Sequence, residues 1–250
     1  MTTQTLTRSA STTRWLVDAG DDRTGPPLVI FPHAGAGPSA YRRLGRAVAG
    51  AFRPLIVHLP GRETRLDDEP YRDLPTLVRA LCPAVVPLLS SRFAFYGHSM
   101  GALVAFELAR LLRRTYGVEP DHLVVSGHAA PRGTWPPKRH RLCDQELWAS
   151  VCGMLGTPPE VAGDPQMRAM LLPTFRADFE VCETYRYRPE RALECPITSF
   201  AGEHDDEAPP AAMTGWGAET RVAYRHQTLP GNHFFNLSDR YPTQLLHALT

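Results

Sequence analysis

Residues 93–110 read FAFYGHSMGALVAFELAR, and this stretch decides the fold prediction. A short apolar run over residues 92–97 is typical of a buried strand, and the pattern over residues 100–114 is that of an apolar helix. Between them, Gly97-His98-Ser99-Met100-Gly101 matches G-x-S-x-G. A strand that turns at once into a helix strains the middle residue, and the flanking glycines let the chain segments pass closely. Ser99 is therefore predicted to be a nucleophile held above a sheet, with a plain turn serine as the alternative.

The residues around this stretch predict a parallel sheet. Short apolar runs alternate with longer helical patterns, as in strands linked by helical crossovers. Asp73 is a candidate N-cap, while Pro83 and Pro87 are expected to kink or shorten their helix. Ser126 also ends an apolar run, but it lacks the preceding glycine and the following helix, so we expect it in a loop. The predicted strands cover residues 26–31, 53–60, 92–97 and 121–127, and the predicted helices cover 39–48, 73–89 and 100–114.

The pattern changes after residue 130. Residues 131–191 contain helical stretches broken by Gly and Pro and no convincing buried strand, whereas strands return at 196–203 and 221–231 before a final helix over 241–250. A helical insertion in one parallel sheet is expected to form a lid over the carboxyl ends of the strands, where such sheets bind ligands. We therefore predict a loose tail (1–14), a core in two parts (15–130 and 192–250) and a lid (131–191).

The partners of a serine nucleophile in this architecture follow in the order acid, then histidine. His233 lies just past the last predicted strand and downstream of an acidic loop, whereas His226 falls inside that strand and His247 on the final helix. We predict His233 as the base. The acid comes from the loop after residues 196–201, where Asp205 is preferred and Asp206 is the main rival.

The loop FPHAGAGPSAY, residues 31–41, follows the first strand of the core and is the expected source of an oxyanion donor. We predict that the backbone N–H groups of Ala34 and Met100 form the oxyanion hole. The alternative is that the glycines of this loop only permit a turn. A phosphate loop is disfavoured, because the stretch lacks the Lys-Ser/Thr ending and the G-x-G-x-x-G spacing.

Composition limits the other classes of function. A formal net charge of +1 gives no overall field for nucleic acid or a membrane surface, and no apolar run is long enough to span a bilayer. Five cysteines without a CxxC pair suit a reducing compartment, and the polar N-terminus lacks the core of a signal peptide. No histidine or cysteine motif indicates a metal site. We expect a soluble cytoplasmic protein without a metal or cofactor.

Six stretches, in order, resemble the stand-alone type II thioesterases of polyketide synthases and nonribosomal peptide synthetases. They are FPHAGAGPSAY (31–41), HLPGRETRL (58–66), FAFYGHSMGALVAFELAR (93–110), LLPTFRADFEVCETYRYRP (171–189), CPITSFAGEHD (195–205) and LPGNHFFNL (229–237). The resemblance implies an α/β-hydrolase fold, a mostly parallel central sheet flanked by helices with a helical lid. It places the triad at Ser99, Asp205 and His233 and an oxyanion donor at Ala34. The neighbouring Asp206 leaves the register of the acid open.

The implied activity is hydrolysis of acyl groups from the phosphopantetheine thiol of acyl or peptidyl carrier domains, which removes stalled or wrongly loaded units. The alternatives are a lipase or esterase acting on free esters and a carrier-binding protein with little turnover. We expect a monomer. Lid side chains are candidates to line the acyl channel, although each of them fits a lid core as well; they are Trp135, Trp148, Met154, Met167, Met170, Phe175 and Phe179.

Overall fold

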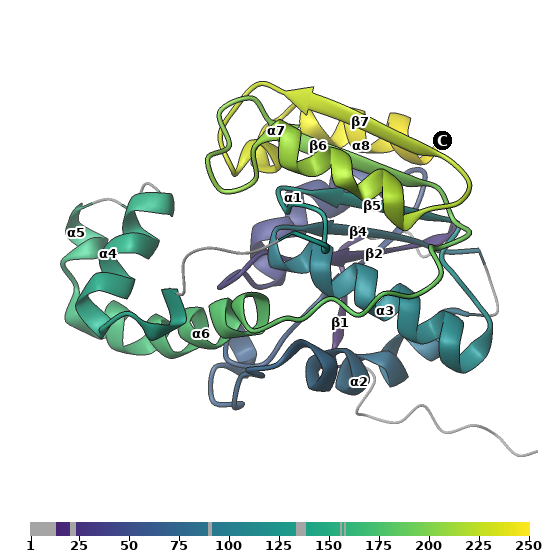
Figure 1. The fold of residues 1–250 in the computed structure, drawn as a ribbon. Coiled ribbons are helices and arrows are strands. Elements are labelled where there is room, and N and C mark those ends of the chain that lie inside the picture. The colour runs from purple at the N-terminus through teal and green to yellow at the C-terminus, as the bar shows by residue number, and fades with distance from the viewer. Residues whose placement is uncertain (1–13, 21–23, 90–91, 134–138, 156, 158) are drawn as a thin grey trace, which may run out of the picture.

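A seven-stranded sheet forms the centre of the protein (Figure 1). The computed structural model describes residues 14–20, 24–89, 92–133, 139–155, 157 and 159–250. The strand order is β1-β3-β2-β4-β5-β6-β7; β1 pairs antiparallel with β3, and every other pairing is parallel. The strands are β1 (Leu16–Asp18), β2 (Pro27–Phe31), β3 (Arg53–Val57), β4 (Ala94–His98), β5 (His122–Ser126), β6 (Ile197–Gly202) and β7 (Tyr224–Leu229).

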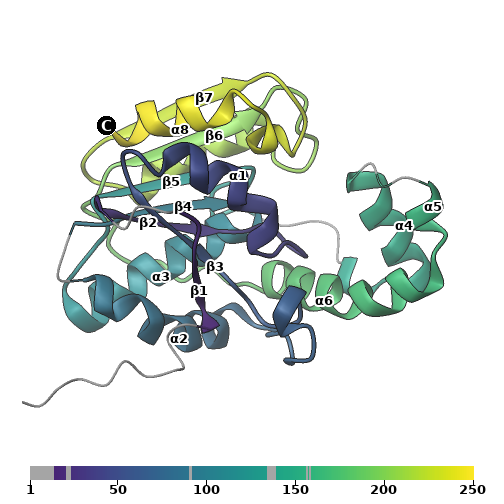
Figure 2. The same ribbon diagram turned by 180° about the vertical axis from the view of Figure 1, so that it is seen from behind.

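Helices cover both faces of this sheet (Figures 1 and 2). Because successive side chains of a strand point to opposite faces, Leu28 and Ile30 of β2 join one core cluster, and Val29 and Phe31 join another. The first cluster packs against α1 (Pro38–Val48) and α8 (Tyr241–Leu249), and the second packs against α2 (Leu74–Val85) and α3 (Met100–Tyr116). This two-sided burial explains why the inner strands read as continuous apolar runs.

Helix α2 is shorter than the helix predicted over residues 73–89. Asp73 caps α2 by accepting a hydrogen bond from the Thr76 amide at 2.9 Å, as predicted. The helix passes through Pro83 and ends at Val85, and Pro87 lies in a following 3-10 turn. The helix ends two residues before Pro87, in line with the expected shortening, whereas Pro83 does not end it.

The insertion between β5 and β6 contains α4 (Asp144–Leu155), α5 (Pro159–Ala162) and α6 (Pro165–Glu183). Figure 1 shows these helices standing beyond the end of the sheet toward which the β7 arrowhead points. Helices α4 and α6 share a small core of their own, composed of Leu147, Trp148, Val151, Leu172, Phe175 and Phe179. Within the described part of the insertion, helix is the regular structure, as the sequence predicts.

One sequence-based expectation needs correction, and one strand was not predicted. Ser126 is the last residue of β5 and fully buried, not a loop residue, because β4 and β6 pair on either side of it. Strand β1 was not expected, since three residues are too few to show a strand period and its pairing with β3 defines it. Among the described helices, none is long and apolar enough to span a membrane.

Candidate active site

Ser99 lies at the turn from β4 into α3, with φ 54° and ψ −123°. This positive φ is a strained conformation for a residue with a side chain. The flanking glycines are required by space: a Cβ at Gly101 would collide with the Phe31 carbonyl, and a Cβ at Gly97 would collide with the Gly101 carbonyl. The Ser99 amide donates to the Ser126 carbonyl at 2.8 Å, which fixes the turn to β5. The Ser99 side chain makes no capping hydrogen bond to α3.

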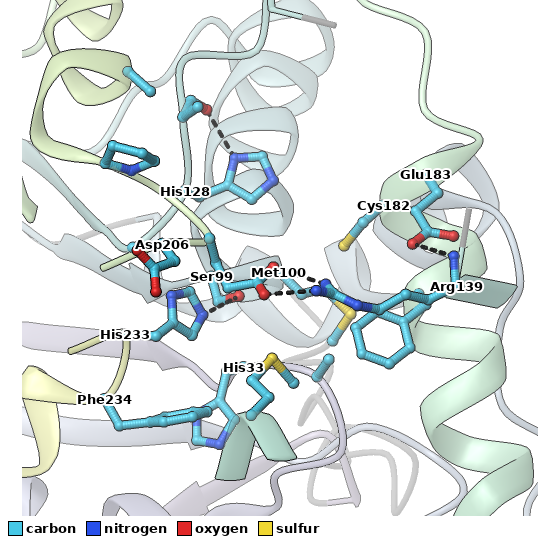
Figure 3. Close-up of a pocket in the computed structure, with 18 residues that line it drawn as sticks. His33, Ser99, Met100, His128, Arg139, Cys182, Glu183, Asp206, His233 and Phe234 are labelled. Atoms are coloured by element: carbon cyan, nitrogen blue, oxygen red, sulfur yellow. Dashed lines mark hydrogen bonds and ion pairs between the residues drawn. The ribbon is translucent and has the colours of Figure 1, made fainter. Parts of the chain in front are cut away.

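The structure brings the three predicted side chains together. The Nε2 atom of His233 lies 3.0 Å from the Ser99 hydroxyl oxygen, and its Nδ1 atom lies 3.0 Å from each carboxylate oxygen of Asp205. Figure 3 shows the His233 ring directed at Ser99 from the loop after β7. An Nδ1–H donated to the carboxylate leaves Nε2 free to accept the serine proton. This is the arrangement that general-base activation of a hydroxyl requires.

Two adjacent aspartates of the acidic loop have different environments. Asp205 is 2% exposed, and its Oδ1 also accepts hydrogen bonds from the backbone amides of Glu207 at 2.9 Å and Ala208 at 3.0 Å. These donors orient the carboxylate toward His233. Asp206 is exposed and lines the pocket without a hydrogen bond to His233 in the described structure. The geometry therefore favours Asp205 over Asp206 as the partner of His233.

The predicted oxyanion donors both line the same pocket as Ser99. Met100 is the first residue of α3, so its amide has no partner within the helix. Ala34 is the second residue of a turn closed by the Ala36 amide donating to the His33 carbonyl at 3.1 Å, with Gly35 at φ +77°. In the described part of the chain, neither the Ala34 nor the Met100 amide donates to a protein acceptor. Both N–H groups are available to a ligand oxygen.

Three further histidines surround His233 in the site. The rings of His98 and His233 are 5.1 Å apart, and those of His33 and His98 are 5.9 Å apart. Burial, with a smaller repulsion from His233, lowers the pKa of His33 to about 3 and that of His98 well below its usual range. Burial also lowers the pKa of His128 to about 4. These three rings are neutral at physiological pH. Across the described residues, no group of three His, Cys, Asp or Glu could hold a metal ion.

A pocket of about 420 Å³ opens above Ser99. Figure 3 shows Arg139, Cys182 and Glu183 of the insertion on the side of the pocket away from His233. Met154 and Phe179 of the insertion also line the pocket. Arg139 reaches across this pocket from the insertion and makes a two-pronged ion pair with Glu207, with N–O distances of 2.7 and 2.6 Å. This pair joins the insertion to the loop that carries Asp205. No local pattern predicts this pair, because the two residues are 68 positions apart.

The candidate lid side chains divide into several groups. Met154 and Phe179 line the pocket, whereas Trp148 packs inside the insertion and donates its indole N–H to the Ala162 carbonyl. Met170 is exposed, Met167 is half-buried, and Phe175 lies in a neighbouring pocket behind Ala34. Trp135 lies outside the described residues, as do residues 1–13 of the expected tail.

The sheet, the serine turn and the hydrogen-bonded Ser–His–Asp chain define a serine hydrolase of the α/β class. The sequence matches the family described as Thioesterase domain over residues 26–250. It is 35% identical to the gramicidin S biosynthesis protein GrsT of Aneurinibacillus migulanus over 238 residues, which cover 94% of this chain and 93% of that protein. The chain therefore belongs to the thioesterase domain family.

Solved structures of thioesterases have the same fold as this chain. The type II thioesterase BorB from the borrelidin biosynthetic cluster superposes with a TM-score of 0.85 at 33% identity and covers 94% of this chain and 98% of its own. The RedJ thioesterase of the prodiginine pathway in Streptomyces coelicolor gives 0.83 at 35% identity, with 90% and 89% covered. The predicted α/β-hydrolase fold and the resemblance to type II thioesterases are confirmed.

Proposed function

We propose that the protein hydrolyses acyl thioesters on the phosphopantetheine arm of carrier domains in a polyketide or nonribosomal peptide pathway. One observation carries the chemistry: a histidine bonded to a buried aspartate on one side and to a serine hydroxyl on the other, at the floor of a pocket. The relatives support the pathway class, since GrsT is named for gramicidin S biosynthesis and BorB is named as a type II thioesterase from a biosynthetic cluster.

In the proposed reaction, His233 takes the proton of Ser99 as the hydroxyl oxygen attacks the thioester carbonyl. The developing oxyanion accepts hydrogen bonds from the amides of Ala34 and Met100. Collapse breaks the carbon–sulfur bond, and the protonated His233 supplies the proton to the departing thiol. Water, deprotonated by His233, then attacks the acyl-serine carbonyl. The bond from the carbonyl carbon to the Ser99 oxygen breaks, His233 returns the proton to that oxygen, and the acid is released. Asp205 holds the imidazole tautomer and stabilises the imidazolium in both halves of the reaction.

We further propose that residues 131–191 act as a lid over the pocket and that carrier domains approach the pocket from the side of this lid. We also propose that the enzyme needs no cofactor. The pocket supports the lid, since residues of the insertion and of the core line it together. A monomeric state and a cytoplasmic location stay predictions.

The test compares catalytic efficiency on one acyl group attached to three leaving groups: a carrier-bound phosphopantetheine, a small thiol and an alcohol. We expect the largest kcat/KM for the carrier-bound thioester. Greater efficiency on the oxygen ester would support the esterase alternative. A carrier-binding protein with little turnover would bind the carrier but resist labelling of Ser99 by a fluorophosphonate, whereas we expect stoichiometric labelling that Ser99→Ala abolishes.

A further inference from the structure

A buried ion pair connects the insertion to the core behind the proposed oxyanion hole. Arg62 follows β3, and Asp178 lies in the second half of α6. The two guanidinium nitrogens lie 2.7 and 2.9 Å from the two carboxylate oxygens, and the side chains are 4% and 3% exposed. A two-pronged pair of this kind fixes both direction and distance. No step of the proposed reaction uses either residue.

Asp178 also binds the loop that carries Ala34. Its Oδ2 accepts a hydrogen bond from the Gly35 amide at 2.7 Å, in addition to the bond from Arg62. Arg62 in turn donates to the Ala36 carbonyl at 3.4 Å. The ion pair therefore contacts the turn at the two residues that follow Ala34, and so limits how the neighbouring Ala34 peptide can rotate.

Helix α6 packs directly on this turn. A Cβ at Gly35 would collide with the Phe175 ring, which lies one turn before Asp178 on the same helix. One residue earlier, Thr174 donates its hydroxyl to the Gly61 carbonyl, beside Arg62. The second half of α6 thus contacts the core through Thr174, Phe175 and Asp178. The turn that contains Ala34 and Gly35 therefore packs directly against α6.

Stability alone is a weak reason for a charged pair in this place. Two buried charges lose their hydration, and apolar side chains of similar volume often give an equally stable protein. What an apolar pair lacks is an acceptor for the Gly35 amide. A charged acceptor makes that hydrogen bond short and strongly directional.

We propose that Asp178 is a positioning residue, through which α6 orients the Ala34 amide toward the oxyanion. This proposal rests on the proposed function, because Ala34 is an oxyanion donor only in that reaction. It assigns the insertion a part in transition-state stabilisation besides covering the pocket. Loss of one oxyanion donor lowers kcat by about 100- to 1,000-fold. A donor that stays but is misaligned is expected to cause a smaller loss, about 10- to 100-fold.

The experiment uses Asp178→Asn and the matched control Asp144→Asn. The control breaks the exposed ion pair between Asp144 of α4 and Arg176 of α6, which makes no contact with the Ala34 turn in the described structure. Activity is measured on a small acyl thioester and normalised to sites titrated by a fluorophosphonate. The second readout is the inhibition constant of an acyl trifluoromethyl ketone, which binds the serine as a tetrahedral oxyanion. We expect Asp178→Asn to lower kcat at least tenfold while KM changes less than threefold. The inhibition constant of the ketone should rise by a factor similar to the loss of kcat. We expect Asp144→Asn to change kcat and the inhibition constant by no more than twofold.

The double variant Arg62→Met/Asp178→Leu separates positioning from stability. It removes both charges, so we expect a melting temperature near that of the wild type while kcat stays low, because the Gly35 amide still lacks its acceptor. A kcat within threefold of wild type in this variant would overturn the proposal, as would a ketone affinity unchanged by Asp178→Asn. If Asp178→Asn fails to fold, the double variant decides alone. A wild-type protein without turnover on any thioester would instead contradict the proposed function.

Discussion

Replacing Asp205 by Asn tests the proposed triad at its most constrained carboxylate. The Asp205 Oδ1 accepts from the backbone amides of Glu207 and Ala208, and both of its oxygens face the Nδ1 of His233 at 3.0 Å. Asn has one acceptor oxygen where Asp has two. If that oxygen stays with the two backbone donors, its NH₂ group faces Nδ1, and His233 must move its proton to Nε2. The serine hydroxyl then has no base.

The expected size of the loss follows from this tautomer change. The same substitution in a serine protease triad lowers kcat about 10⁴-fold, which corresponds to about 5.4 kcal/mol at 1.36 kcal/mol for each factor of ten. Asp206→Asn is the matched control, because Asp206 is exposed one residue away and has no hydrogen bond to His233 in the described structure. We expect the control to change kcat less than threefold.

The assay follows thiol release from an acyl thioester, with melting temperatures recorded for both variants. A loss in Asp205→Asn that merely tracks a fall in folded protein would not count as catalytic. The assignment is wrong if Asp206→Asn loses as much activity as Asp205→Asn, or if Asp205→Asn keeps more than a tenth of the wild-type kcat at an unchanged melting temperature.

Three other outcomes concern strain, packing and protonation. Ser99→Gly should be more stable than Ser99→Ala by about 1 kcal/mol in thermal melts, because glycine adopts φ 54° without strain; a lower stability would contradict the strained turn. Gly101→Ala should lower the free energy of unfolding by about 3 kcal/mol, because the new Cβ collides with a β2 carbonyl. The control Gly153→Ala, at an open position on α4, should leave the free energy of unfolding in urea unchanged or raise it. Equal effects of the two substitutions would contradict the collision. The lowered pKa values of His33 and His128 give stability that is present above pH 6.5 and lost as pH falls toward 4, since only the unfolded chain takes up these protons. Urea unfolding at pH 7.5 and 5.5 should therefore show a loss of about 1.4 kcal/mol for each of these histidines; an increase would contradict their burial as neutral rings.

Local patterns predicted the parts of the fold that depend on local chemistry. The stretch over residues 93–110 carries its strand, its glycines and its helix within 18 positions, so the turn at Ser99 could be predicted without knowing the rest of the fold. The strands buried on both faces are similarly clear, because burial on both sides demands continuous apolar runs. The mostly parallel class of the sheet follows from the alternation of strands with helices.

Other features depend on contacts that the sequence does not encode locally. Asp205 and Asp206 are neighbours of the same type, and only the amides of Glu207 and Ala208 single out the first. Asp178 reads as an ordinary polar residue of a long helix, since its partner Arg62 lies 116 residues away. Strand β1 exists because β3 offers it a free edge, as its own three residues carry no period.

The most direct test of the central claim is intact-mass analysis of acylated carrier domains incubated with the enzyme. A panel of carriers bearing different acyl groups is treated with the wild type and with Ser99→Ala, and the mass of each carrier is followed over time. The account predicts that the wild type returns acylated carriers to the free phosphopantetheine mass, while Ser99→Ala leaves them acylated. Acyl groups that persist equally with both proteins across the whole panel would contradict it.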